Sequence, residues 1–413
     1  MKTAAPRFNR MNKIATSAFF ADPLGILAHA LAELGDVFSF QLFGEENLFM
    51  ISANAARHIL IEHPSSFAAS EGNLVTGKEL FGNAFIYLDG AEHTRKRHSF
   101  APSFGARVDE SLDARVAAVI EECLPPGPSD IGRISNAMFL RIAGLKLLRF
   151  DLGIDAAYVS RLLIELASGL YSDPSSRQTD GVYAVAMQAK AHLIEFWQAR
   201  TEQLEYFRVS LGLQGDRDSF IAEVTDDLNA ILWAGFDTCS AVFAFAIEYI
   251  GGNFGLLDRL KSASNSSLEC NRILYSTLSN SIFYETLRLR PPVYLISRRA
   301  TQASVVDGIR IRDGQLINLV PILLQRSPHY YDRSEYFDPD RFVNGVQGPT
   351  RDGYFIPFGS GPKTCIGASI GKWMFRLALD HLIDRDFMVS QPRTTLRWIP
   401  GLASLSGPGV EIP

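Results

Sequence analysis

The sequence has few cysteines, and none of them is spaced as a metal-binding or disulfide pair. Its 413 residues include four cysteines, which lie far apart at Cys123, Cys239, Cys270 and Cys365. Structural zinc sites use closely spaced Cys and His ligands, and disulfide frameworks are typical of short secreted chains. The sequence therefore predicts neither structural zinc nor a disulfide scaffold, and it favours a reducing compartment.

The sequence also lacks an excess of positive charge and a long uninterrupted apolar run. Its formal net charge is -5, which argues against nucleic acid as a partner. The basic N-terminus is not followed by a compact apolar stretch with a cleavage site, and no run reaches the ~18 to 20 apolar residues of a membrane span. Residues 221–250 come nearest but contain acidic residues, so we expect a cytoplasmic protein without a membrane anchor.

A glycine-rich stretch near the C-terminus, residues 354–375, stands out from the rest of the chain. It places Cys365 in a loop with several glycines and just before a run with helical apolar spacing, residues 368–383. The N-terminus of a helix and the N–H groups of a loop both favour a thiolate. Glycines allow the backbone to turn sharply and to lie close to a flat ligand. The alternative interpretation is a buried free cysteine beside a tight turn.

The ten residues from Phe358 to Gly367, Phe-Gly-Ser-Gly-Pro-Lys-Thr-Cys-Ile-Gly, resemble the haem-thiolate signature of the cytochromes P450. The resemblance implies that Cys365 is the axial ligand of haem b, iron-protoporphyrin IX. It also implies haem contacts from Phe358, Gly359, Lys363, Ile366 and Gly367. Lys363 stands where the family usually has arginine or histidine facing a propionate, and it can form an ion pair without arginine's planar fork.

The first hundred residues contain a hairpin pattern, a long irregular segment and a basic helix. Residues 36–52 read as two β-rich runs joined by a turn, residues 53–63 as a helix, and residues 65–89 as a binding loop. In the helix expected over 90–104, His93 and Arg97 are four apart and share a face. By the resemblance this pair binds haem propionates, whereas Arg95 and Lys96 point to another face, which in the family receives an acidic redox partner. A solvated helix surface is the alternative for the basic cluster.

The longest helical pattern covers residues 219–250 and carries Ala234-Gly-Phe-Asp-Thr238 in its middle. Polar residues and glycine there cost helix stability, although a threonine can bond the carbonyl four residues back. The phrase resembles the oxygen-activating kink of the family. The resemblance implies a loosened backbone beside the haem at Ala234 and Gly235, and proton supply through Thr238 and Asp237.

A second helix, expected over residues 274–290, carries Glu285 and Arg288 on one face. This pair and Arg341 match the family's buried cluster of one carboxylate and two arginines, which needs mutual hydrogen bonds to be tolerable. We therefore expect these three residues to be structural. Residues 293–318 read as short strands, and Arg298 falls where the family has another propionate-binding arginine, with Arg299 as the alternative.

The candidate substrate contacts are apolar and come from several segments, including a closing loop at residues 400–406. They are Phe81, Phe85, Leu232, Val293, Leu295 and Leu402. Apolar pockets are common among soluble proteins, so this composition indicates only a small hydrophobic substrate.

The expected fold class is mainly α with small β-sheets (α+β). The resemblance implies one cytochrome P450 domain over residues 1–413, with the haem sandwiched between the long central helix and the helix that follows the cysteine loop. It implies a monomeric monooxygenase that uses O2 to hydroxylate or epoxidise a hydrophobic compound of secondary metabolism. Electrons would come from NAD(P)H through a ferredoxin and a ferredoxin reductase. Two alternatives stay open: oxidative coupling, desaturation or cyclisation without net oxygen insertion, and a non-enzymatic haem-binding or sensor protein.

Overall fold

The structure is a computed structural model that describes most of the chain. The described residues are 16–42, 44–69, 75–105, 110–171, 181–210, 217–253, 255–264, 269–346, 350–385, 387–391, 395–399, 402–406 and 409–412.

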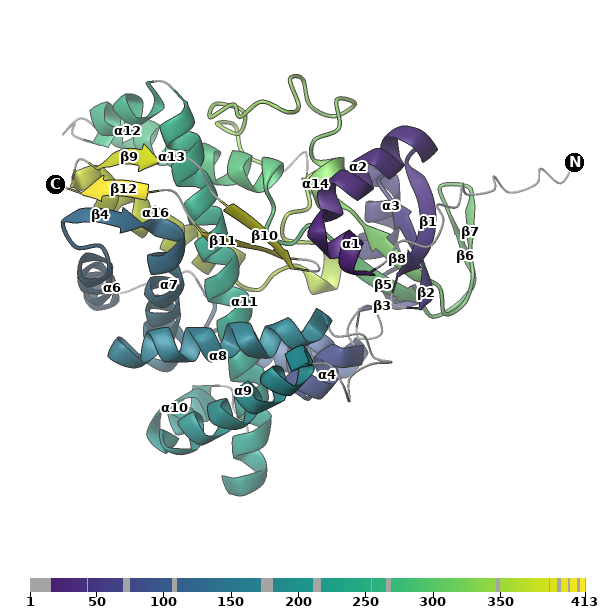
Figure 1. Cartoon of the computed structure of the whole chain (residues 1–413), viewed down its shortest axis with the longest axis horizontal. Coiled ribbons are helices and arrows are strands. Elements are labelled where there is room, and N and C mark those ends of the chain that lie inside the picture. Colours follow the sequence, from purple (N-terminus) through teal and green to yellow (C-terminus); the bar gives the residue numbers. More distant parts are fainter. Residues whose placement is uncertain are drawn as a thin grey trace, which may run out of the picture.

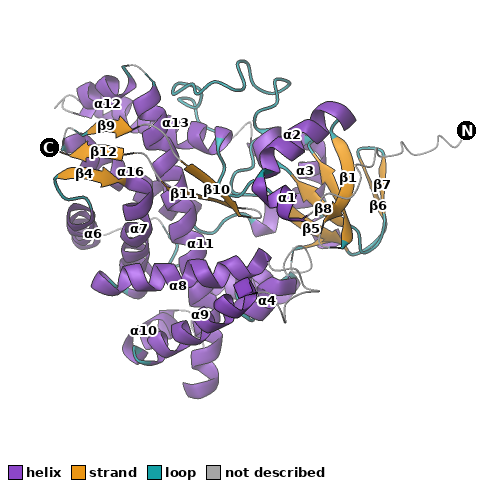
Figure 2. Ribbon diagram, in the orientation of Figure 1, coloured by secondary structure: helices purple, strands orange, loops and turns teal. Residues whose placement is uncertain are grey.

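Helices make up most of the described chain, and strands form small sheets (Figure 2). The α-helices are α1 (Thr16–Ala21), α2 (Pro23–Leu34), α3 (Ala53–Arg57), α4 (Val75–Phe81), α5 (Gly90–Phe100), α6 (Glu110–Cys123), α7 (Ile131–Leu148), α8 (Ala156–Ser168), α9 (Gly181–Gln198), α10 (Thr201–Ser210), α11 (Arg217–Gly252), α12 (Leu256–Ser264), α13 (Glu269–Leu289), α14 (Pro321–Leu324) and α16 (Ala368–Asp384). The expected class, mainly α with small sheets, is confirmed.

The strands form one larger sheet and three smaller ones. The strands are β1 (Val37–Leu42), β2 (Glu45–Met50), β3 (Phe67–Ala68), β4 (Gly127–Asp130), β5 (Ile296–Ala300), β6 (Ser304–Val306), β7 (Ile309–Ile311), β8 (Leu316–Leu319), β9 (Met388–Gln391), β10 (Thr395–Ile399), β11 (Leu402–Ser406) and β12 (Gly409–Ile412). The five-stranded sheet has the order β1-β2-β8-β5-β3, and the others are β4-β12-β9, β10-β11 and β6-β7. In the larger sheet only β2 and β8 run parallel.

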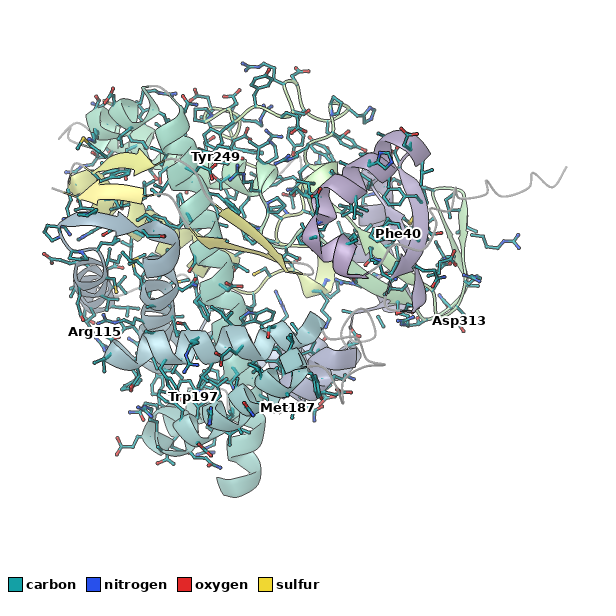
Figure 3. All side chains as sticks on the ribbon, viewed as in Figure 1. Phe40, Arg115, Met187, Trp197, Tyr249 and Asp313 are labelled. Atoms are coloured by element: carbon teal, nitrogen blue, oxygen red, sulfur yellow. The ribbon has the colours of Figure 1, made fainter. Side chains whose placement is uncertain are left out.

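The apolar side chains divide between two cores. One fills the space among the helices and includes the fully buried Trp197, and the other lies around the five-stranded sheet and includes Phe40. Both residues are labelled in Figure 3 and lie in separate parts of the molecule. Stacked rings of Phe38, Phe40 and Phe49 fix the β1–β2 hairpin in the second core.

The longest helix, α11, runs through the helical part of the molecule and packs against α7, α13 and α16 (Figure 1). The segment 224–252 of this helix is long enough and apolar enough to cross a membrane. It was not predicted as a span from the sequence because acidic residues interrupt its apolar run. However, 78% of its most apolar window is buried inside the molecule. The helix therefore serves here as part of the core.

The structure confirms the main expected elements and corrects three others. The hairpin pairs Val37 with Met50, as its pattern predicts. Residues 65–89, expected to be irregular, include β3 and α4. The helix expected over 53–63 is α-helical only to Arg57 and continues as a π-helix, η1 (His58–Glu62). Of the closing loop expected at 400–406, residues 402–406 are instead the strand β11, paired with β10, and Pro400 and Gly401 lie outside the described residues. The sequences of both strands are β-prone.

Candidate active site

One face of α11 borders a hollow inside the molecule. Ala234, Gly235, Thr238 and Cys239 are partly exposed, whereas the residues around them on the helix are buried. These four positions lie on one helical face, since residues four apart are neighbours. A Cβ atom added to Gly235 would meet no atom within 4 Å. This face therefore leaves room for a ligand to approach the helix backbone.

A tight loop positions Cys365. The short 3₁₀ helix η6 (Gly361–Lys363) precedes it, and the Cys365 N–H donates to the Phe358 carbonyl at 2.9 Å. Gly359 and Gly361 have φ of 67° and 69°, a region that non-glycine residues rarely adopt. A Cβ on Gly361 would also lie 1.8 Å from the Leu60 carbonyl oxygen of η1. The glycine thus lets the loop lie directly against η1.

The Cys365 side chain is accessible to solvent, although it lies within the molecule. Although its side chain is exposed, the surrounding protein still desolvates its thiol. Burial raises the pKa of its thiol, while hydrogen bonds from the N–H groups of Gly367 and Ala368 and the charge of Arg97 act in the opposite direction. Because Gly367 is the N-cap of α16, the helix N-terminus adds to this stabilisation of a thiolate.

Cys239 shows that the two sides of the hollow lie close together. Burial, and secondarily the nearby Cys365, raises the pKa of Cys239 to about 12. Cys239 belongs to the partly exposed face of α11, whereas Cys365 belongs to the loop before α16. The structure therefore brings together the α11 face and the cysteine loop that the sequence singled out.

A cluster of basic side chains lies near the cysteine loop. Burial, followed by the charges of Lys363 and Arg97, lowers the pKa of His93 to about 4. Burial also lowers the pKa of Lys363 to about 8 and that of Arg298 to about 10. Lys363 donates to the Leu88 carbonyl, and its Nζ lies 3.3 Å from Asp89 Oδ1. The structure thus brings together the four side chains that the resemblance assigned to propionates.

This cluster carries more positive charge than the carboxylates around it balance. Asp89 is the carboxylate that acts on His93, Lys363 and Arg298. The Arg298 guanidinium donates to the Ser297 carbonyl at 2.8 Å, and within the described residues the Arg97 side chain makes no hydrogen bond or ion pair. Buried cations normally need such partners. The donors therefore fit a ligand with two carboxylates, such as haem, beside a thiol that can ligate its iron.

Asp237 and Thr238 provide a titratable group and a hydroxyl next to the hollow. Asp237 is 5% exposed, and burial raises the pKa of its carboxyl to about 7. Within the described part of the chain that carboxyl makes no hydrogen bond or ion pair. Thr238 Oγ1 donates to the Ala234 carbonyl at 2.7 Å. The carboxyl can therefore both hold and release a proton near neutral pH.

The helix around this pair does not show the expected loosening. α11 is continuous from Arg217 to Gly252, so the predicted opening of the backbone at Gly235 is wrong for this structure. Instead, Thr238 donates to the carbonyl of Ala234, four residues back, as in the alternative interpretation of this phrase. Space beside Gly235 comes from its missing side chain rather than from a break in the helix.

Glu285, Arg288 and Arg341 form the predicted cluster. Glu285 accepts from Arg288 Nε at 2.7 Å and Nη2 at 2.8 Å, and from Arg341 Nε at 3.2 Å. Arg288 also donates to the backbone carbonyls of Gln325, Ser334 and Tyr336. Glu285 and Arg288 are fully buried. The cluster thus ties α13 to the long segment that leads to the cysteine loop.

Arg298 and Arg299 were alternatives in sequence, and their contacts separate them. Arg299 forms a two-pronged pair with Glu45, with both N–O distances 3.0 Å. Adjacent residues of a strand point to opposite faces, and Arg298 lies beside Asp89 and Lys363. Arg298, unlike Arg299, therefore lies with the basic side chains near the cysteine loop.

The predicted surface position of Lys96 is wrong. Lys96 is 2% exposed, and its Nζ lies 2.9 Å from Oδ2 of Asp227, which is 1% exposed. Asp227 also accepts from the Phe85 N–H at 2.6 Å. Sequence reasoning missed this pair because its members are far apart in the chain. An aspartate within an apolar helix was the available signal.

The six candidate substrate contacts are placed differently from one another. Phe81, Phe85 and Leu232 are buried in the helical core, and Phe81 stacks on Trp233 with ring centroids 5.3 Å apart. Leu295 is 9% exposed and Val293 is partly exposed. Leu402 belongs to β11, next to α11, but its side chain lies outside the described residues.

Comparison with known proteins identifies the family. The family model for cytochrome P450 matches residues 215–404, which include α11, the Glu285 cluster and the Cys365 loop. The chain belongs to the cytochrome P450 superfamily. Cytochromes P450 are haem-thiolate proteins, and the protein is accordingly a haem-thiolate oxidoreductase.

Relatives with similarity over most of the chain include two Streptomyces melanosporofaciens enzymes. Cyclooctatin synthase is 25% identical in a match that covers 81% of this chain and 79% of the length of the synthase. Cyclooctat-9-en-7-ol 5-monooxygenase is 24% identical in a match that covers 95% of this chain and 91% of the length of that enzyme. The solved structure named retinoic acid bound cyanobacterial CYP120A1 matches with a TM-score of 0.80 and 19% identity, over 99% of this chain and 100% of that one. At that identity the structural match shows the fold of this P450.

Proposed function

We propose that this cytochrome P450 is a monooxygenase that uses O2 to hydroxylate or epoxidise a small hydrophobic compound of secondary metabolism. The observation that carries the proposal is the pairing across one hollow of Cys365, with its N–H donors, and the Asp237–Thr238 pair. The first suits a thiolate ligand, and the second suits proton supply. A protein that only bound haem would not need the second.

The proposed cofactor is haem b, held through Cys365 and the basic cluster. His93, Arg97, Arg298 and Lys363 would bind its propionates, for which they have donors to spare. Residues of α11 and the loop would lie along its faces: Ala234, Gly235, Phe358, Gly359, Ile366 and Gly367. When bound, a haem with a thiolate ligand activates dioxygen and favours O–O cleavage.

The proposed catalytic residues of the chain are Asp237 and Thr238. With its pKa raised to about 7 by burial, Asp237 can take a proton from water and pass it on near neutral pH. Thr238 stands on the partly exposed face of α11, and in this proposal its hydroxyl turns toward the hollow to orient that proton. Turning the hydroxyl inward would require it to leave the Ala234 carbonyl.

The substrate class rests on the relatives and on the apolar lining. The name of one relative describes a monooxygenase acting on cyclooctat-9-en-7-ol, and the solved relative holds retinoic acid. Both names point to largely hydrocarbon ligands. Val293 and Leu295 come just before β5, the strand that carries Arg298, and in this proposal they contact a substrate above the haem. Identities of 24–25% support the class of substrate rather than a particular compound.

Electrons are proposed to come from NAD(P)H through a ferredoxin and its reductase, with the P450 acting as a cytoplasmic monomer. A different pocket, of about 240 Å³, lies beside the cysteine loop, and it is lined by residues including Phe358, Thr364 and Lys372 rather than by the face of α11. Its position next to the ligand loop supports this side of the protein as the place where a small electron carrier docks.

An oxygen-isotope experiment tests the proposed reaction. The holoenzyme is supplied with NAD(P)H, a ferredoxin, its reductase, candidate terpenoid substrates and ¹⁸O₂. We expect reductant consumption coupled to a product that contains one ¹⁸O atom. A product without the label would show coupling, desaturation or cyclisation instead, and the absence of any turnover-dependent product would contradict the monooxygenase proposal.

A further inference from the structure

We propose that His58, Glu62 and His63 form a binding site for one divalent transition-metal ion of the zinc type. Within the described residues, these three are the one group of His, Cys, Asp or Glu side chains whose donor atoms gather closely enough to hold an ion. The site lies outside the hollow between α11 and Cys365 and does not depend on the proposed reaction.

The π-helical turn is what brings the three side chains together. The His63 N–H donates to the His58 carbonyl at 2.9 Å, which closes a bond over five residues. Positions four and five residues after His58 therefore lie on the same face as His58, whereas in an α-helix the fifth would have turned away. The donor atoms of His58, Glu62 and His63 all lie within 4.8 Å of one another, and the two imidazole centroids are 4.3 Å apart.

The donor set has the chemistry of a zinc site with an open position. Two imidazole nitrogens and one carboxylate oxygen are common zinc ligands, with bond lengths of about 2.0–2.2 Å and water as the fourth ligand. His58 Nδ1 lies 3.9 Å from Glu62 Oε2, so the donors must approach one another slightly. Glu62 and His63 are exposed and free to adjust, whereas His58 is partly buried.

The competing contact of Glu62 leaves one oxygen for an ion. Arg57 Nε lies 2.8 Å from Glu62 Oε1, whereas Oε2 is the oxygen that faces His58. Both members of the arginine pair are exposed, and exposed ion pairs contribute little stability. The arginine can therefore keep its oxygen or release it when the ion binds.

The position of the site links it to the cysteine loop. Leu60, between the proposed ligands, presents its carbonyl to Gly361 so closely that a Cβ there would lie 1.8 Å away. An ion bound to His58 and His63 would clamp the two ends of this π-turn. Bound metal thus stabilises the segment against which the cysteine loop rests.

The test is a titration of the chelator-treated, haem-loaded protein with Zn²⁺, followed by calorimetry and by thermal unfolding. We expect one Zn²⁺ per chain and a rise in the Tm. Both are lost in the H58Q/H63Q variant, and E62Q, which keeps both imidazoles, binds more weakly. His29 is an exposed histidine on α2 outside the group, so H29Q is the matched control and should behave as the unmodified protein.

The proposal is overturned if Zn²⁺ neither releases heat nor raises the Tm at submillimolar concentration. It is equally overturned if H58Q/H63Q binds the ion with unchanged affinity, since the ion would then sit elsewhere. Because two of the three side chains are exposed, we expect the variants to fold; a near-native circular dichroism spectrum checks this. If H58Q/H63Q is unfolded, E62Q with unchanged affinity would contradict the site.

Discussion

At the scale of single residues, Asp237 is the most informative side chain beside the hollow. Its carboxyl is buried, and within the described residues it has no hydrogen-bond partner. Burial raises its pKa from 3.8 to about 7. Such a group costs stability when it is charged and is of use where a proton must be delivered. The sequence could indicate its role through the family phrase, but not its environment.

The raised pKa predicts a specific pH dependence of stability. Between pH 4 and pH 7 the folded state keeps a proton on Asp237 that the unfolded state has lost, so this residue makes stability fall as pH rises. We expect the free energy of unfolding of D237N not to show this decrease. The difference in free energy of unfolding between D237N and the unmodified protein should therefore grow in favour of D237N from pH 5 to pH 7.5, and urea unfolding at both pH values measures this difference. An equal stability difference at the two pH values would contradict the account.

Helical spacing in the sequence correctly grouped His93 with Arg97 on one face of a helix, but it failed to predict the burial of Lys96. His93 and Arg97 share a helix face by their spacing, and the structure places them near Lys363. Lys96 lies on the same helix, but a cation within a basic run gives no sign that Asp227 of another helix will bury it. Long-range pairing of this kind cannot be read from local pattern.

At the scale of elements, the pair formed by Lys96 and Asp227 joins α5 to α11. Lys96 Nζ also donates to the Asn83 carbonyl at 2.9 Å, and Asp227 accepts from the Phe85 N–H. The pair therefore fixes the segment between α4 and α5 against the central helix. Buried pairs add little net stability compared with apolar residues, but removing one member leaves an uncompensated charge.

We therefore expect K96M to lower the free energy of unfolding by about 3–5 kcal/mol. Arg95, the neighbouring exposed cation on α5, provides the control, and R95M should change stability by less than about 0.5 kcal/mol. Chemical unfolding of the haem-loaded protein measures both. In the double variant K96M/D227N, the effects should be less than additive, since the charge left by the first change is removed by the second. Strict additivity would show that the two side chains do not act as a pair.

Long elements followed from the sequence better than irregular ones. Apolar periodicity and end signals located α11, α13 and α16 to within a few residues, because these helices bury a face along their whole length. The π-turn after Arg57 and the β10–β11 hairpin were missed. The π-turn packs against a distant segment, the cysteine loop, which no local window contains. The β10–β11 hairpin pairs residues that are close in the sequence, so its two β-prone runs were a local signal that was missed.

At the scale of the whole molecule, the cysteine loop lies where the two cores meet. Leu60 belongs to the core around the five-stranded sheet, whereas Phe358 and Ile366 pack against the helical core. The contact between them is the close approach of Gly361 to the Leu60 carbonyl. The family signature identified the glycines but could not show that one of them serves the junction of two cores.

Two glycine variants test this junction. Gly359 and Gly361 have nearly the same positive φ. A Cβ on Gly361 would lie 1.8 Å from the Leu60 carbonyl oxygen, whereas a Cβ on Gly359 would lie at an ordinary contact distance of 3.8 Å from the Lys363 carbonyl oxygen. G359A should therefore cost about 1–2 kcal/mol from strain alone. G361A should cost more and should reduce the fraction of purified protein that contains haem, because the loop must move away from η1. Chemical unfolding and haem content are the measurements, and equal effects of the two changes would contradict the junction.

The central claim is that Cys365 is the thiolate ligand of a haem. The most direct test is the absorption spectrum of the reduced protein with carbon monoxide, recorded beside C365A and the control C239A. We expect a strongly red-shifted Soret band in the unmodified protein and in C239A, and its loss in C365A. A band at the position typical of histidine-ligated haem, or a red-shifted band that survives in C365A, would contradict the assignment of this site.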